Sequence, residues 1–269
     1  MPVSSASLAG IIAIALYITA AWQVLQVLRH RRAGPGPLFP VLAAMAVVLH
    51  GWALWEVTVL AEGVRLGLFP MASLVTGTGA ALVAVASFRR RLEWISTLAY
   101  PLSALALPPA LWLDTAYTPE PLAHGLASHA ILAIVAFAVL AIAAIHAIFL
   151  LVQHRQLKEG HIRGVLRIFP PVQTMERMLF ELLWAGVLLL TGAIVTGFIY
   201  LDDLIAQQVA HKTVLTLAAW LLFSILLAGH HLLGWRALTA VRFTLGGFVV
   251  LVVAFFGSRF VLEVLLQGR

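Results

Sequence analysis

The chain has 269 residues, of which 62% are hydrophobic and only 10% are charged. Soluble domains carry about 25% charged residues, so this composition excludes a soluble globular protein and a disordered chain. The sequence contains no cysteine, which excludes a disulfide scaffold, an iron–sulfur cluster and a cysteine-based zinc site. We expect no nucleic-acid partner despite the formal net charge of +6, because in so apolar a chain that charge reflects the orientation of membrane loops.

Eight apolar runs follow one another along the chain, each long enough to cross a bilayer as a helix. They cover about residues 6–28, 37–60, 67–88, 93–112, 124–152, 178–200, 212–232 and 240–266. The connections between them are too short to form a soluble catalytic domain. The sequence therefore predicts an all-α, polytopic integral membrane bundle of about eight transmembrane helices, forming a single domain over residues 1–269. Any function must lie inside this bundle or at its two ends.

Basic residues are distributed unevenly between the two sides of the predicted bundle. Thirteen of the 17 Lys and Arg residues belong to the connections after the first, third, fifth and seventh runs, and four belong to the other side. Cytoplasmic loops of membrane proteins carry the excess of Lys and Arg. We therefore expect a bacterial-type inner membrane protein with both termini on the outer side.

Ionisable side chains inside apolar runs are costly in a bilayer and are functional candidates by default. Five of the nine found here are histidines, and a histidine-rich set without thiolates suits haem iron or another transition metal. For any single histidine, the alternative is a hydrogen bond across a helix contact. The nine residues are His50, Glu56, His129, His146, Glu181, His230, His231, Arg259 and Glu263.

Depth in the membrane groups some of these histidines. At the α-helical rise, His50 lies about 20 Å from the cytoplasmic start of its run. His129 comes a few residues into a run that begins on the outer side, so both residues are expected in the outer half of the membrane. His230 closes the seventh run and is expected near the cytoplasmic face.

Several motifs between about residues 65 and 260 resemble the transmembrane cytochrome c assembly family (CcsA/CcmC-like). The matching segments are Pro170-Pro171-Val172-Gln173-Thr174-Met175-Glu176-Arg177, Leu190-Thr191-Gly192 with Thr196-Gly197, Gly67-Leu68-Phe69-Pro70-Met71-Ala72-Ser73, Lys212 with Trp220, and His230 followed by Gly234-Trp235-Arg236. The family's haem-presenting members have a Trp-rich outer loop, whereas residues 201–211 contain no Trp. A second outer histidine is also absent, with Ser258 and Arg259 in its place. The chain therefore most resembles the short YpjD/HemX-like branch.

The resemblance implies a haem-binding, haem-handling protein of cytochrome c assembly or haem homeostasis. The expected cofactor is non-covalent haem b, and no catalysis is expected. His50 and His129 would be the axial pair, and His230 a ligand on the inner side. Bidentate pairing of a guanidinium with a carboxylate suggests Arg259 as the partner of a haem propionate. The alternative is an ion pair with Glu263, four residues further along the helix, or snorkelling of the side chain to the interface. The mouth of the inner site would be formed by Trp235 and Arg236.

Two alternatives remain open from the sequence. The first is a transporter, because Pro101, Pro108 and Pro109 can kink the fourth helix. The second is a non-catalytic scaffold that stabilises another integral membrane protein, with the histidines serving only as packing groups. Membrane lipid is an expected partner in all three cases.

Overall fold

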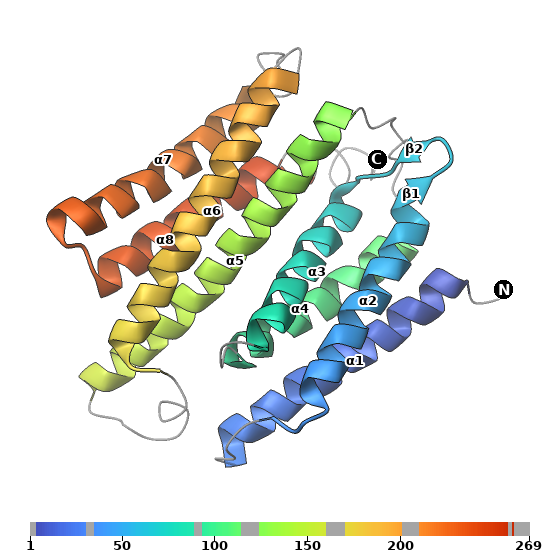
Figure 1. Ribbon diagram of the computed structural model, residues 1–269, viewed down its shortest axis with the longest axis horizontal. Helices are drawn as coiled ribbons and strands as arrows, with labels where there is room; N and C mark the ends of the chain where they lie inside the picture. Colours follow the sequence, from blue (N-terminus) through green and yellow to red (C-terminus); the bar gives the residue numbers. More distant parts are fainter. Residues whose placement is uncertain are drawn as a thin grey trace. The chain divides into compact units, whose positions relative to one another are not determined.

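The computed structural model describes residues 4–30, 35–88, 93–113, 124–159, 170–200, 210–257 and 260. Within these residues the chain forms eight α-helices, one pair of two-residue strands and one π-helical turn (Figure 1). Their bounds are α1 Ser5–His30, α2 Phe39–Thr58, β1 Val59–Leu60, β2 Gly63–Val64, α3 Leu68–Ser87, α4 Glu93–Trp112, α5 His124–Lys158, α6 Val172–Tyr200, α7 Ala210–Leu233, α8 Ala237–Val252 and η2 Val253–Gly257. The predicted all-α bundle is confirmed.

In the described part of the chain, seven helices are long and apolar enough to span a membrane. The exception is α4, which forms over the predicted range but contains Pro101, Pro108 and Pro109. The orientation of the bundle, with both termini outside, stays a prediction.

Two element boundaries differ from those predicted. The helix α2 ends at Thr58 rather than residue 60, because the chain turns into an antiparallel hairpin that pairs Val59 with Val64. Gly63 adopts φ 143° in this hairpin, a conformation that favours glycine. The helix α6 begins at Val172, six residues before the predicted start. Pro171 immediately precedes this first turn, where a proline near a helix start is well tolerated.

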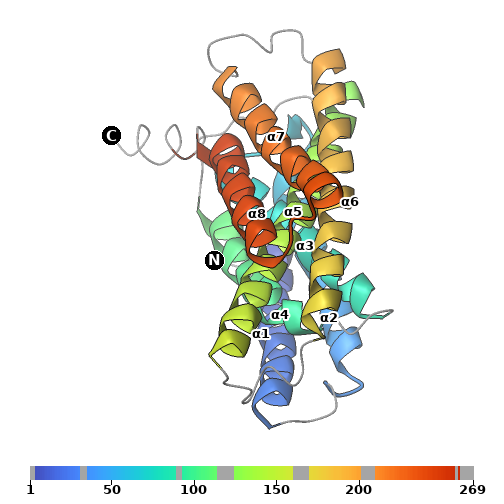
Figure 2. The same ribbon diagram turned by 90° about the vertical axis from the view of Figure 1, so that its left-hand side faces the viewer.

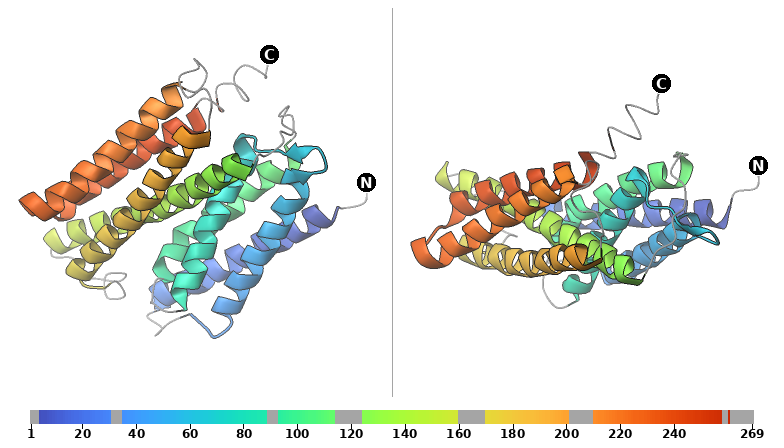
Figure 3. Two further views of the ribbon diagram at one scale, coloured as in Figure 1. Left: turned by 45° about the horizontal axis from the view of Figure 1, so that its top comes forward. Right: turned by 90° about the horizontal axis from the view of Figure 1, so that it is seen from above.

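The chain divides into two compact units, described here separately. Unit 1 contains α1–α4, with α1 packed against α2 and α4, and α3 packed against α4 and α2 (Figure 3). Its apolar core includes Ala13 of α1, Leu54 of α2 and Leu107 of α4. The prediction of a single domain for the whole chain stays a prediction.

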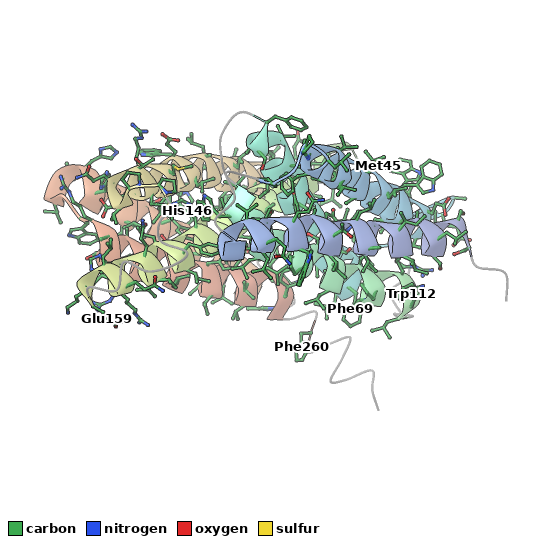
Figure 4. All side chains as sticks on the ribbon, turned by 90° about the horizontal axis from the view of Figure 1, so that it is seen from below. Met45, Phe69, Trp112, His146, Glu159 and Phe260 are labelled. Carbon is green, nitrogen blue, oxygen red and sulfur yellow. The ribbon has the colours of Figure 1, made fainter. Side chains whose placement is uncertain are left out.

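Tryptophans lie at the end of unit 1 where α1 begins and where α2 and α4 end. Trp52 and Trp55 are 56% and 63% exposed, and Trp112 closes α4 with its ring half exposed (Figure 4). The Trp112 indole donates a hydrogen bond to the Ser7 hydroxyl over 3.2 Å. Exposed Trp residues at one level are typical of an aromatic belt at a membrane–water interface.

Unit 2 contains α5–α8. Its two longest helices, α5 and α6, run side by side, while α8 packs on α5 and α7 packs on α6 (Figure 2). Glycines permit the close contacts: Gly186 of α6 faces Leu140 of α5, and Gly247 of α8 faces Phe223 of α7. A Cβ atom at residue 247 would lie 2.9 Å from the Phe223 ring, whereas nothing lies within 4 Å of one at Gly246.

This pair of adjacent glycines gives a test of the packing in unit 2. We expect Gly247→Val to lower the free energy of unfolding by about 1–3 kcal/mol, the usual effect of overpacking a buried contact. Gly246→Val introduces the same side chain at an exposed position of the same helix and should have little effect. Thermal unfolding of both variants in detergent measures the difference, and equal stabilities would contradict the α7–α8 contact.

Candidate functional site

His50 lies in the centre of unit 1, and its side chain is fully buried. Its Nδ1 atom is 3.2 Å from the Tyr17 hydroxyl of α1, and its Nε2 atom is 3.0 Å from the Ser73 hydroxyl of α3. Both ring nitrogens therefore have side-chain partners from neighbouring helices. Iron ligation through His50 requires one of these two hydrogen bonds to open.

The surroundings of His50 are tightly packed. A Cβ atom at Gly77 of α3 would lie 3.0 Å from the imidazole ring, so glycine at this position lets α3 approach His50. The rings of Tyr17 and Tyr100 lie 5.4 Å apart, which brings α4 into the same cluster. All four helices of unit 1 thus meet around this histidine.

His129 lies near the start of α5 in unit 2 and is partly buried. Its Nδ1 atom is 2.8 Å from the carbonyl oxygen of Ala193 on α6. Because a carbonyl oxygen only accepts hydrogen bonds, Nδ1 carries a proton in this bond, and Nε2 is the ring nitrogen through which a metal could bind. Histidines that ligate metals are typically held in this way, by donating the other ring N–H to a carbonyl or carboxylate.

His230 lies in the last turn of α7 and has the same arrangement. Its Nδ1 atom donates to the carbonyl oxygen of Trp235 over 2.8 Å. One face of its ring stacks on Phe180 of α6, with ring centroids 3.6 Å apart and an interplanar angle of 16°. The neighbouring His231 is exposed, and its ring meets that of His230 edge-on at 5.4 Å.

His146 lies deeper in α5 and is fully buried (Figure 4). Its Nε2 atom is 2.8 Å from the carbonyl oxygen of Met175 in the first turns of α6. This bond and that of His129 join α5 to α6 at two levels, 17 residues apart along α5. His146 therefore has a clear packing role in the α5–α6 pair.

The structure brings only some of the predicted site residues together. His230, Trp235 and Arg236 meet at the turn between α7 and α8, where the Trp235 ring lies 5.1 Å from that of Phe243. His50 and His129 belong to different units, so their predicted pairing stays a prediction. Arg259 lies outside the described residues. Among the residues that are described, no group of three or more His, Asp or Glu side chains could hold a metal ion.

Four residues that sequence reasoning gave no role contact the candidate histidines or the turn beside them. Tyr17 and Ser73 bond to His50, Phe180 stacks on His230, and Glu176 bonds to the backbone of the α7–α8 turn. Glu176 stands in a motif that the family resemblance singled out. Ser73 closes another of those motifs, whereas Tyr17, 33 residues from His50 in the sequence, has no such signal.

The hydrogen bonds of His50 predict a measurable contribution to stability. Removing the imidazole deprives the Tyr17 and Ser73 hydroxyls of a partner, and an unsatisfied buried polar group costs about 1–3 kcal/mol. We expect His50→Ala to lower the free energy of unfolding by about 3 kcal/mol once the cavity is included. Tyr17→Phe, which keeps the ring, should lower it by about 1 kcal/mol. Val48→Ala, at a 69% exposed position of the same helix, is the control in detergent unfolding. A His50→Ala protein as stable as this control would contradict the role of the network.

Comparisons with known proteins agree with the fold and with the motifs. The sequence model described as "Cytochrome C assembly protein" matches residues 38–266, beginning earlier than the expected residue 65. Inner membrane protein YpjD of Escherichia coli K12 is 29% identical over 260 residues, which cover 95% of this chain and 98% of that protein. An uncharacterized 28.8 kDa protein of Azospirillum brasilense is 29% identical over 160 residues, or 59% of this chain and 54% of that protein. No solved structure matches. Because the family match extends from α2 through η2, the chain belongs to the cytochrome c assembly protein family.

Proposed function

We propose that this protein binds haem non-covalently in the inner membrane and handles it in cytochrome c assembly or haem homeostasis, without catalysing a reaction. The observation that carries the proposal is the orientation of His129 and His230. Each donates its Nδ1–H to a backbone carbonyl over 2.8 Å, which leaves Nε2 as a ligand atom. Membership of the cytochrome c assembly family favours haem over another metal.

Haem b fits this donor set because its iron accepts one or two imidazoles and needs no thiolate. Bound haem would supply an iron centre able to take those ligands and two propionates able to pair with cations. Within unit 2, α6 runs antiparallel to α5, so α5 and α7 run in the same direction. His129 is near the start of α5 and His230 near the end of α7, so the two histidines lie towards opposite ends of the unit. We therefore propose an outer ligand position at His129 and an inner one at His230, with Trp235 and Arg236 beside the inner one.

The second axial ligand of the outer position is proposed to be His50. Ligation through His50 Nε2 would replace the hydrogen bond to Ser73, and ligation through Nδ1 would replace that to Tyr17. Arg259 remains the proposed partner of a propionate in the outer half.

One alternative has its own supporting observation. His50 in unit 1 and His146 in unit 2 are both fully buried, and each is hydrogen-bonded to a neighbouring helix of its own unit. This is expected for packing groups in a scaffold that supports another integral membrane protein. Haem binding and the scaffold role predict opposite results in a simple optical measurement.

The test is the absorption spectrum of the detergent-purified protein, oxidised and reduced, with and without supplied haem. We expect a Soret band that loses its low-spin character in His129→Ala and in His50→Ala, because each removes one of the proposed axial pair. In His230→Ala the band should lose intensity, because this variant removes the proposed inner ligand. Ser128→Ala and His231→Ala, at exposed positions next to two of these histidines, should leave the spectrum unchanged. The absence of a Soret band after haem is supplied to the wild-type protein would remove the haem proposal and favour the scaffold.

A further inference from the structure

The turn between α7 and α8 consists of only three residues, Gly234, Trp235 and Arg236. Gly234 has φ 67°, as a glycine at a helix end readily does. Ala237, the first residue of α8, has φ 37°, which is strained for a residue with a Cβ atom. Arg236 is the N-cap of α8 but makes no side-chain capping bond. The strained backbone of Ala237 therefore has no capping side chain within the turn itself.

Glu176 of α6 supplies a capping interaction from outside the turn. Its Oε1 atom accepts a hydrogen bond from the backbone N–H of Ala237 over 2.8 Å, from a residue 61 positions away in the sequence. A carboxylate at this place satisfies one of the free N–H groups of the first turn of α8. It also interacts favourably with the positive end of the helix dipole.

The turn that Glu176 holds also contains the hydrogen-bond partner of His230. The Trp235 carbonyl accepts the Nδ1–H of His230, while the Trp235 N–H donates to the Gly229 carbonyl over 3.2 Å. The Trp235 indole packs directly on Gly229, where a larger side chain would collide with it. Since Trp235 and Ala237 are two residues apart, the position of the Trp235 carbonyl depends on where Ala237 is fixed.

The same face of α6 contacts the imidazole ring itself. Glu176 and Phe180 are four residues apart and therefore lie on one side of the helix. Phe180 stacks on the ring of His230, and one turn further Trp184 lies 5.8 Å from the ring of His231. Figure 2 shows the end of α7 and the turn beside α6. One α6 surface thus holds both the ring of His230 and the backbone to which it bonds.

We propose that Glu176 is a positioning residue for His230. By holding Ala237, it keeps the Trp235 carbonyl in place, which fixes the ring proton on Nδ1 and presents the Nε2 lone pair to a ligand. The identification of the ligand as haem iron rests on the proposed function. The control of the His230 ring proton by Glu176 is independent of it. Partners of this kind affect metal affinity strongly, since their removal from established sites typically weakens binding about 10- to 100-fold.

The test measures the ring proton directly, without haem. Protein with ¹⁵N-labelled histidine is studied by NMR in lipid nanodiscs, and the His230 resonances are assigned by difference with His230→Gln. Protonated and unprotonated ring nitrogens have well-separated ¹⁵N frequencies. We expect a dominant Nδ1–H tautomer in the wild-type protein and in Glu176→Gln, whose amide oxygen still accepts the Ala237 N–H. In Glu176→Ala we expect a mixture of the two tautomers.

Glu181→Gln is the matched control, because Glu181 lies on the same helix and is 3.8 Å from Arg177 in an exposed pair. It should retain the wild-type tautomer. If Glu176→Ala fails to fold, Glu176→Asp replaces it, since its shorter side chain does not reach Ala237. An unchanged tautomer in a folded Glu176→Ala or Glu176→Asp protein would overturn the proposal.

A second measurement separates this proposal from the haem proposal. Haem titration should show about 10- to 100-fold weaker binding at the inner position in Glu176→Ala and near wild-type binding in Glu176→Gln. If the wild-type protein binds no haem, the proposed function fails, but a tautomer that changes in Glu176→Ala still supports the role of Glu176. If haem binds and the tautomer does not respond, the proposed function stands and the role of Glu176 is overturned.

Discussion

Polar groups in the interior of a bilayer have no water to bond to, so they must find partners within the protein. This constraint explains the surroundings of His50, His129, His146 and His230. Each bonds to a group on another helix or on an adjoining turn. The kind of partner differs, however, and that difference decides what each imidazole can do.

A carbonyl partner and a hydroxyl partner have different consequences for a histidine. A carbonyl only accepts, so it assigns the ring proton and leaves the other nitrogen with a free lone pair. His129 and His230 are bound in this way through Nδ1. A hydroxyl both donates and accepts, and His50 has one on each nitrogen. His50 therefore sits in a closed network, whereas the two carbonyl-bound rings each keep an atom suited to a ligand.

The helices were predictable from the sequence because a membrane span needs about 20 apolar residues, which leave a long and plain signal. The first turns of α6 were missed because Glu176 and Arg177 interrupt the apolar pattern, although Pro170 and Pro171 mark a helix start. The hairpin of β1 and β2 was missed because two-residue strands have no periodicity. The resemblance to the cytochrome c assembly family, predicted from short motifs, is confirmed by the match of the family model.

The partners of the candidate histidines were not predictable in the same way. Whether Tyr17 and Ser73 reach His50 depends on how α1 and α3 are rotated about their axes, and apolar runs of this length show little one-sided pattern. The bond between Glu176 and Ala237 depends on the path of a three-residue turn. Sequence reasoning identified His230, Trp235 and Arg236 as one group because they are adjacent in the chain, but not the α6 residues that hold them.

The helix α6 emerges as the element that organises unit 2. Its backbone accepts the ring protons of His129 at Ala193 and of His146 at Met175. Its side chains at residues 176 and 180 hold the turn and the ring of His230. A shift or rotation of α6 would therefore change the environment of all three histidines together. Because His129 and His230 lie towards opposite ends of the unit, α6 is a physical connection between the two proposed ligand positions, through which a change at one end can reach the other.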